Sequence, residues 1–532
     1  MPAITTNTSL APYTGSFTRA HAQHLLRRTT LATQEARIEE AMNLGLLGSI
    51  TQLFSTPPSP GLPINRSNPN DSNVSIGESF VNADGPPNSA AIISRATSLK
   101  VWLIEQYCQS DFNINSRMTL FWYNHFAVFY NLDARASYNT QMLYWNFATG
   151  DFRELVKRMT VDFNMLKFLN GDQNVAALPN ENFARELLEL FTVGKGPQVG
   201  SGDYTNYTEQ DVQAIAKALT GWQVRNNNST APGARPESYF TASRHDPSPR
   251  TLSARFNNKV LTVVGEDAYK EVVDTIFDSP SAAHYLCRKL YRYFVYYEID
   301  SVIEQNIIEP LAQMLKDNNF VLAPVLQTLL SSEHFFQQGL FRALIKSPLD
   351  LLADVTYGTS FPLPTDPIDY ELILDTFHSN IIRTGMDLTN PPSVAGHEAW
   401  HIAPLYQRMW INSPSLKQRI LMTSQIFGHG FLRNGTRYTA DMVSFIEDIP
   451  NAEDPNVLIA SLCERFLGVV LNQANLDFFK NFLLGGLPDF EWTVEYNNML
   501  ANPSDTQLRQ AVEGKLDVTC RAFFAMPEIH LY

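Results

Sequence analysis

The segment SAAHYLCRKLYRYFV, residues 281–295, decides the fold class. Its apolar side chains recur three and four residues apart, which places them on one side of an α-helix: Ala283, Leu286, Leu290, Tyr293 and Phe294. The segment DTQLRQAVEGKLDVTCRAFF (505–524) repeats this pattern. No sustained alternation of apolar and polar residues, which a half-buried strand requires, is present. We therefore predict an all-α fold, a large multi-helix bundle with long irregular loops, little or no sheet and more than half of its residues helical.

Capping residues predict where individual helices begin and end. Thr208 followed by Asp211 fits a capping box, and Gly221 fits the end of the same helix. Ser504, which follows Pro503, predicts another helix start.

Two loop-rich stretches suggest how the chain is organised. Residues 55–90 are rich in Pro, Asn, Ser and Gly, which predicts a long surface loop or a disordered insertion. A second loop, at 357–368, suggests a boundary between lobes. We expect an N-terminal tail (1–14), an N-terminal helical lobe (15–356) and a C-terminal helical lobe (357–532), the two lobes forming one continuous domain.

Composition excludes several classes of protein. A chain of 532 residues with 44% apolar residues can bury a large core, so a disordered or fibrous protein is excluded. The formal charge of −14 argues against nucleic acid as a partner. No apolar run is long enough to span a bilayer. The first thirty residues carry no signal peptide, which taken alone favours a cytoplasmic location, and the compartment is unknown. The four cysteines are widely spaced, and we expect buried free thiols.

Short motifs spread over nearly the whole chain resemble one bacterial family. The central pair is LNGDQNVAALPNENFARELLELFTVG (169–194) and YTEQDVQAIAKALTGW (207–222). The supporting motifs are HLLRRTTLA (24–32), MTLFWYNHF (118–126), DFRELVKRMTVD (151–162), RHDPSPR (244–250), LIKSPLDLL (344–352), PPSVAG (391–396) and WINSPSL (410–416). In this order they resemble the domain of unknown function 1800 family.

The resemblance implies little chemistry, because no activity, cofactor or catalytic residue is established for the family. It implies that members are often exported and are often encoded beside proteins of the domain of unknown function 1501 family, which names a candidate partner. The chain departs from the family pattern in three places. It has no visible export signal, Asn170 stands where Asp is common, and HEAWH follows PPSVAG where a loop containing Trp-Pro is usual.

Residues 170–181 have the ligand spacing of a calcium loop. Asn170, Asp172, Asn174 and Glu181 occupy positions 1, 3, 5 and 12 of a twelve-residue segment, as oxygen ligands do in an EF-hand. Position 6 is Val175 instead of the usual Gly, and only two of the four side chains are charged, so the affinity should be weak.

A simpler interpretation of the same segment needs no metal. Asn180 caps the following helix, and Glu181, Arg185 and Glu189 form a ladder of charges spaced four apart. We favour this interpretation and keep calcium as the alternative.

His397, Glu398 and His401 form a literal HExxH. On a helix this motif places both imidazoles on one face toward zinc, with the glutamate as general base. Here Gly396 and Pro404 leave about two turns for a helix, and the extended HExxHxxGxxH form is absent. We predict that the segment does not bind zinc.

A third group of polar residues could line a pocket. His125 lies in the aromatic run FWYNHF, His245 and Asp246 lie in a loop, and Glu186 lies on the central motif's helix, which makes them candidate catalytic acids or bases. A histidine in such surroundings is more often a core residue bonded to a neighbouring backbone or carboxylate group. We favour that interpretation.

Two functional hypotheses follow, and the cofactor is unknown, with calcium the candidate. The first is a helical scaffold or binding protein that acts with a partner protein. The alternative is a metal-dependent hydrolase that uses HEAWH or the group of His125, Glu186, His245 and Asp246.

The calcium hypothesis makes a direct prediction about thermal stability. If residues 170–181 bind calcium, millimolar calcium raises the melting temperature of the wild type above its value in chelator. Replacing the closing carboxylate in Glu181→Gln then abolishes that rise. An identical melting temperature of the wild type in calcium and in chelator would exclude the site.

Overall fold

The computed structural model describes residues 7–108, 111–130, 133–468 and 471–532. The chain is 57% helical and 7% strand, which confirms the predicted all-α class. Of the predicted N-terminal tail, 1–14, residues 1–6 lie outside the described residues. Within 7–14, the backbone of Asn7 donates to the side chain of Gln337, and Pro12 forms a β-bridge with Ser332.

Residues 19–277 contain these helices: α1 (Arg19–Thr29), α2 (Glu35–Leu53), α3 (Ser89–Cys108), α4 (Asn115–His125), α5 (Ala134–Asn146), α6 (Phe152–Thr160), α7 (Phe163–Phe168), α8 (Glu181–Glu186), α9 (Glu209–Ala218) and α10 (Ala268–Phe277). The second half contains α11 (Pro280–Phe294), α12 (Ser301–Ile303), α13 (Glu309–Asp317), α14 (Leu322–Leu330), α15 (Pro348–Thr356), α16 (Pro367–Arg383), α17 (Ser413–Ser424), α18 (Met442–Ile446), α19 (Pro455–Leu467), α20 (Gln473–Leu484), α21 (Asp489–Ala501) and α22 (Thr506–Phe524).

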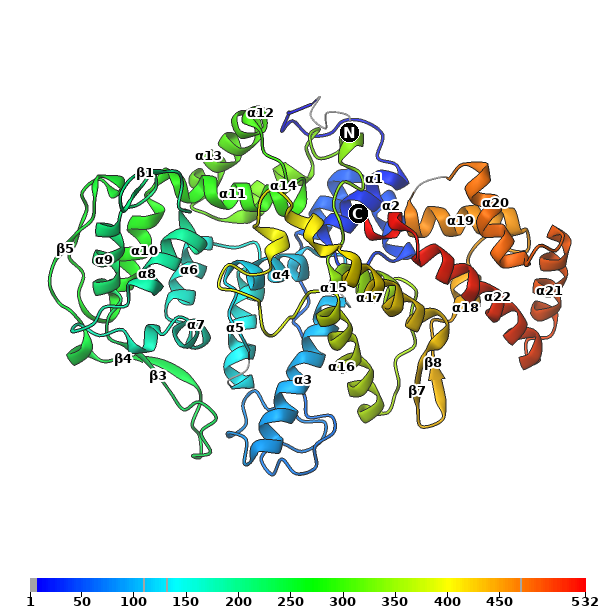
Figure 1. Cartoon of the computed structure of the whole chain (residues 1–532), viewed down its shortest axis with the longest axis horizontal. Coiled ribbons are helices and arrows are strands. Elements are labelled where there is room, and N and C mark those ends of the chain that lie inside the picture. The colour runs from blue at the N-terminus through cyan, green and yellow to red at the C-terminus, as the bar shows by residue number, and fades with distance from the viewer. Residues whose placement is uncertain (1–6, 109–110, 131–132, 469–470) are drawn as a thin grey trace.

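The strands form separate two-stranded antiparallel hairpins between helices. They are β1 (Gln198–Gly200) with β2 (Asp203–Tyr204), β3 (Trp222–Arg225) with β4 (Glu237–Phe240), β5 (Arg250–Thr251) with β6 (Val260–Leu261), and β7 (Phe431–Arg433) with β8 (Thr436–Tyr438). Figure 1 shows an elongated molecule with β1–β6 and α8–α10 at one end and α19–α22 at the other.

Helix α4 lies at the centre of the molecule, and every one of its residues is buried. A helix that is enclosed on all sides cannot leave polar side chains to water, so each must find a partner inside the protein. Trp122 donates its ring N–H to the carbonyl of Ala148 at 3.0 Å, and the Tyr123 hydroxyl donates to the carbonyl of Asp387 at 2.7 Å. These bonds attach segments far apart in sequence to the same helix.

A buried ion pair joins α4 to α15. The guanidinium of Arg117 lies 2.7 Å from the carboxylate of Asp350, and the two side chains are only 2% and 5% exposed. Asp350 also accepts from the backbone and hydroxyl of Ser347, which completes a capping box at the start of α15. One carboxylate therefore both starts a helix and neutralises the central arginine.

Buried arginines satisfy the carbonyl groups that helices and loops leave unpaired. Arg28, Arg117 and Arg419 are at most 2% exposed, and each donates to main-chain oxygens. Those acceptors include the carbonyls of Leu340, Thr30 and Lys346, respectively. A hydrogen bond to a charged group stabilises the folded protein by about 1.5–3 kcal/mol. A guanidinium buried in the core without hydrogen bonds would destabilise the fold by more than this.

The stretch at 55–90 is an irregular loop that folds back on itself beside α3 (Figure 1). Arg95 of α3 forms a buried ion pair at 2.7 Å with Asp71 in this loop, and Asn65 donates to the carbonyls of Asn68 and Val74. These contacts give the loop an internal structure.

The local helix signals were partly correct. Thr208 and Asp211 form the predicted capping box of α9. The predicted start at Ser504 is wrong by one residue, because the side chain of Asp505 accepts from the backbone of Gln507 and Leu508 and caps α22. Among the described residues, none of the helices combines the length and apolar character needed to cross a bilayer.

Removing the charge of Asp350 should destabilise the fold strongly. Asp350→Asn leaves Arg117 buried without a counter-charge, which costs about 3–5 kcal/mol. Urea unfolding at pH 7 measures this loss. The matched control is Asp441→Asn, which breaks the half-exposed pair with Arg509 and should cost less than about 1 kcal/mol. Equal costs for the two variants would contradict the central role of the buried pair.

Candidate functional site

The predicted calcium loop is a turn between α7 and α8. Asn170 has a left-handed backbone, with φ of 54°, and Glu181 is exposed in the first turn of α8. Asp172 pairs through Oδ2 with Lys167 at 3.0 Å, while its Oδ1 is buried and has no hydrogen-bond partner in the part of the chain that the structure describes. Only one of the two loop carboxylates is therefore committed to an ion pair.

Asn174 is fully buried and holds the turn together. Its Oδ1 accepts from the backbone of Asn180 at 2.7 Å, and its Nδ2 donates to the carbonyl of Ala216 at 3.0 Å. Asn180 caps α8 as the simpler interpretation expects, whereas Arg185 pairs with Glu209 on α9 instead of with Glu181. Calcium would have to displace the Asn180 contact, and the site stays a prediction.

His125 is hydrogen-bonded in the core. Its Nε2 donates to the carbonyl of Phe191 at 2.9 Å, and its Nδ1 is buried without a partner among the described residues. Burial holds the pKa of His125 well below its usual range. The acceptor lies in a short π-helical segment, Leu187–Thr192, that continues α8. His125 thus attaches α4 to the family's central motif.

The other three candidates of the group have their own surroundings. His245 donates through Nδ1 to the carbonyl of Thr220 at 2.8 Å, and Asp246 lies 3.8 Å from the guanidinium of Arg250. Burial and the nearby Glu189 raise the pKa of Glu186. No hydrogen bond or ion pair between described residues links His125, His245 and Glu186, and their role as catalytic residues stays a prediction.

The HEAWH segment forms a short 3₁₀ turn, Glu398–Trp400, instead of an α-helix. His397 accepts through Nε2 from the backbone of Asp387 at 3.3 Å, and its Nδ1 faces Asn124 Oδ1 at 3.4 Å. This pattern places the ring proton on Nδ1. His401 donates through Nδ1 to the carbonyl of His397 at 3.1 Å. Both nitrogens of His397 and one of His401 therefore face protein groups.

Gly396 is required where this segment meets α4. Its φ is 85°, and a Cβ at this position would lie 2.4 Å from Asn124 Oδ1. That oxygen also accepts from the backbone of His397 at 2.8 Å. Only glycine combines the left-handed backbone with so close an approach.

A cavity of about 540 Å³ lies beside the HEAWH segment. Its walls include Thr384, Glu398, Met409, Trp410 and Asn412, and the carboxylate-bearing Glu398 is exposed. The volume falls within the range of small-molecule sites. Among the described residues, no group of three or more His, Cys, Asp or Glu side chains is arranged to hold a metal ion.

Lys289 on α11 is a residue that the sequence analysis missed. It is half-buried, its ammonium lies 5.3 Å from the centre of the Tyr285 ring, and it makes no hydrogen bond or ion pair with other described residues. Burial and the neighbouring Arg292 lower its pKa to about 7. Nothing in the run CRKLYR distinguishes this lysine from a solvated one, since its environment is created by tertiary packing.

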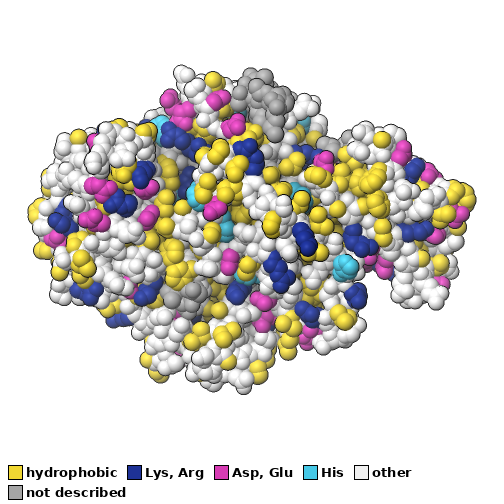
Figure 2. Space-filling view, viewed as in Figure 1, with side chains coloured by type: hydrophobic (Ala, Val, Ile, Leu, Met, Phe, Trp, Pro, Cys, Tyr) yellow, Lys and Arg dark blue, Asp and Glu magenta, His cyan; other side chains and the backbone are white. Residues whose placement is uncertain are grey.

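The hairpin of α20 and α21 exposes large apolar side chains, also missed from sequence. The exposed fractions are 57% for Phe478, 38% for Phe482, 50% for Leu487, 59% for Phe490 and 50% for Val494. The rings of Phe478 and Phe482 lie 5.1 Å apart. Figure 2 shows apolar side chains at this end of the molecule, which Figure 1 identifies as α19–α22.

Comparison with known proteins identifies a family. The family model described as "Protein of unknown function (DUF1800)" matches residues 24–489. The chain belongs to this family. Comparison with curated proteins and with solved structures gives no match. The family match ends at the start of α21, within the exposed hairpin.

The buried imidazole of His397 should make stability depend on pH. Burial lowers its pKa to about 4 from the ordinary 6.5, so the unfolded chain binds a proton between these values while the native protein does not. Stability is therefore lost as the pH falls from 6.5 to 4, by about 3 kcal/mol from this residue. Urea unfolding across this range should show a shallower pH dependence for His397→Gln than for the wild type.

The exposed His429 offers a matched control, because its side chain makes no hydrogen bond with the described residues. His429→Gln should retain the wild-type pH dependence. If His397→Gln also retains the wild-type pH dependence, the prediction is wrong, because His397 is then already protonated in the native protein at pH 6.

Proposed function

We propose that the protein is a helical binding protein that acts with a partner protein, which docks on the α20–α21 hairpin. The observation that carries this proposal is the exposure of Phe478, Phe482 and Phe490 on adjacent helices. Single exposed apolar residues are ordinary, whereas several exposed aromatic side chains on one element mark an interaction surface. Aromatic side chains are also the most frequent anchors of protein interfaces.

The charge of the hairpin indicates the chemistry of the partner. Residues 473–501 contain four carboxylates, Asp477, Asp489, Glu491 and Glu495, and a single cation, Lys480. Lys480 is already paired with Asp489 at 3.2 Å, and Glu495 is paired with Lys515 of α22. Asp477 and Glu491 are left without an ion pair among the described residues. The apolar side chains therefore sit in negatively charged surroundings, which favour a partner whose apolar anchors are flanked by Lys or Arg. The same charges repel an anionic membrane, so a lipid surface is the poorer occupant.

The family resemblance supplies a concrete partner to test, a protein of the domain of unknown function 1501 family. Within this proposal the central region around α4 supplies a rigid body, because its polar side chains are committed to internal bonds such as Tyr123 to Asp387.

The alternative function, a metal-dependent hydrolase, is tested by elemental analysis of protein purified without chelator.

Removing two of the exposed rings should weaken partner binding without unfolding the protein. Phe478→Ser combined with Phe490→Ser removes side chains that are more than half exposed, so the free energy of unfolding should change by less than about 1 kcal/mol. Loss of aromatic anchors should raise the Kd at least about tenfold. Titration calorimetry with the purified partner measures the Kd.

Leu47→Asp is the matched control, because Leu47 is 72% exposed on α2 and lies outside the hairpin. It should leave the Kd unchanged. The docking surface is refuted if Leu47→Asp weakens binding as much as the double variant, or if the double variant binds like the wild type.

A further inference from the structure

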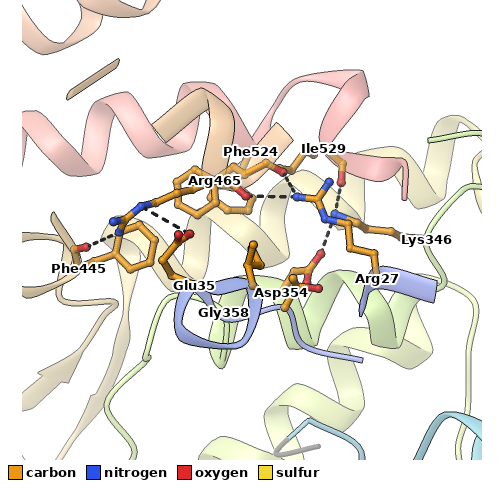
Figure 3. Close-up of a pocket in the computed structure, with 12 residues that line it drawn as sticks. Arg27, Glu35, Lys346, Asp354, Gly358, Phe445, Arg465, Phe524 and Ile529 are labelled. Atoms are coloured by element: carbon orange, nitrogen blue, oxygen red, sulfur yellow. Dashed lines mark hydrogen bonds and ion pairs between the residues drawn. The ribbon is translucent and has the colours of Figure 1, made fainter. Parts of the chain in front are cut away.

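Two cavities of the molecule differ in how far their polar groups are already used. The smaller one, of about 30 Å³, is shown in Figure 3, and its charged walls pair with one another. Lys346 lies 2.7 Å from Asp354. Arg465 lies 3.8 Å from Glu35. This small cavity is therefore a junction of internal ion pairs. The larger one, of about 490 Å³, lies between the end of α2, the start of α4 and the end of α5.

The walls of the larger cavity carry no charge. None of the described residues that line it is Asp, Glu, Lys, Arg or His, although Asp, Glu, Lys and Arg make up 18% of the chain. A ligand with a carboxylate, phosphate or ammonium group would lose part of its hydration there without gaining a counter-charge. The volume falls within the range of small-molecule sites. The cavity therefore favours a small uncharged ligand.

Trp145 on α5 offers an unoccupied aromatic surface in this cavity. Its side chain is partly exposed, and it also lines a neighbouring cavity of about 180 Å³. Its indole N–H donates to none of the described residues, and its ring stacks on none of their aromatic rings. The buried Trp122, by contrast, donates to the carbonyl of Ala148 at 3.0 Å. Trp145 therefore presents both a ring face and a hydrogen-bond donor to a ligand.

Hydroxyl and amide groups without internal partners also line the cavity. The side chains of Ser55, Asn146 and Thr149 make no hydrogen bond with the residues that the structure describes. Asn115 donates through Nδ2 to the carbonyl of Trp145 at 3.1 Å, which leaves its Oδ1 as an acceptor. Hydroxyl and amide groups can each supply both donors and acceptors. This lining matches a ligand that carries several hydroxyl groups.

Other hydrogen bonds hold the cavity walls in place. The side chain of Asn113 donates to the carbonyl of Ser55 at 2.7 Å. The backbone of Ile114 donates to the carbonyl of Leu53 at 2.9 Å, which joins the start of α4 to the end of α2. Residues 57–60 include three prolines, whose rings restrict the backbone of the adjoining wall. A preformed wall of this kind lowers the entropy lost on binding a ligand.

We propose that this cavity binds a neutral saccharide, with one sugar ring stacked on Trp145. The C–H face of a sugar ring is apolar and packs on an indole, while the hydroxyl groups of the sugar donate and accept hydrogen bonds. The uncharged walls favour neutral sugars over acidic or amino sugars. The cavity is lined by none of the residues of the α20–α21 hairpin, so saccharide binding does not depend on the docking of a partner protein there.

Saturation-transfer difference NMR on the full chain tests the site with four neutral probes: glucose, N-acetylglucosamine, cellobiose and maltose. We expect at least one of them to receive saturation on its ring protons and to give one site per chain by titration calorimetry. Glucuronate, which has a carboxylate in place of the primary alcohol of glucose, should bind more weakly than the best neutral probe, because no cation lines the cavity. The proposal is overturned if none of the four neutral probes binds, or if glucuronate binds as tightly as the best of them.

Two variants place the sugar in the cavity. Trp145→Ala removes the stacking surface and should raise the Kd of the best neutral probe at least about tenfold. Asn146→Ala removes an exposed amide that has no internal hydrogen bond, so the protein should fold like the wild type and the Kd should rise about threefold. Phe478→Ala is the control, because it removes an exposed ring outside the cavity and should leave the Kd unchanged. Wild-type affinity in either cavity variant would overturn the assignment.

Discussion

The ion pair between Arg117 and Asp350 is the contact on which the arrangement of the central helices depends. A helix as fully enclosed as α4 would ordinarily carry only apolar residues, but Arg117 places a permanent charge in its first turn. That charge is tolerable only where Asp350 meets it, and Asp350 is fixed because it also caps α15. This ion pair therefore fixes the positions of α4 and α15 relative to each other.

The same principle recurs at the other polar residues of α4. Asn124 accepts from the backbone of His397, and His125 donates to Phe191. Each polar group holds a different segment against the helix, which accounts for side chains that resemble catalytic residues in the sequence. Because their hydrogen bonds are made with other protein groups, these motif residues contribute to internal contacts between segments at least as much as to the surface.

Local signals were readable from the sequence, and contacts between distant segments were not. The capping box at Thr208 was predictable because its atoms belong to four consecutive residues. The start of α22 was harder to predict, because Ser504 and Asp505 are adjacent residues that can both cap a helix, and the structure uses Asp505. The all-α class followed from the spacing of apolar residues. The 3₁₀ turn at 398–400, the environment of Lys289 and the exposure of Phe490 depend on tertiary packing, which periodicity does not encode.

The enclosure of α4 also has a consequence for the newly made chain. The helix is complete at residue 125, but the partners that cover its polar groups, Asp350, Asp387 and His397, are added more than two hundred residues later. At ordinary rates of translation this interval lasts on the order of tens of seconds. Throughout this interval, a helix whose residues are all buried in the finished protein lacks its final cover on the ribosome. The nascent chain should therefore depend on chaperones at this stage, before any of the mature surfaces exists.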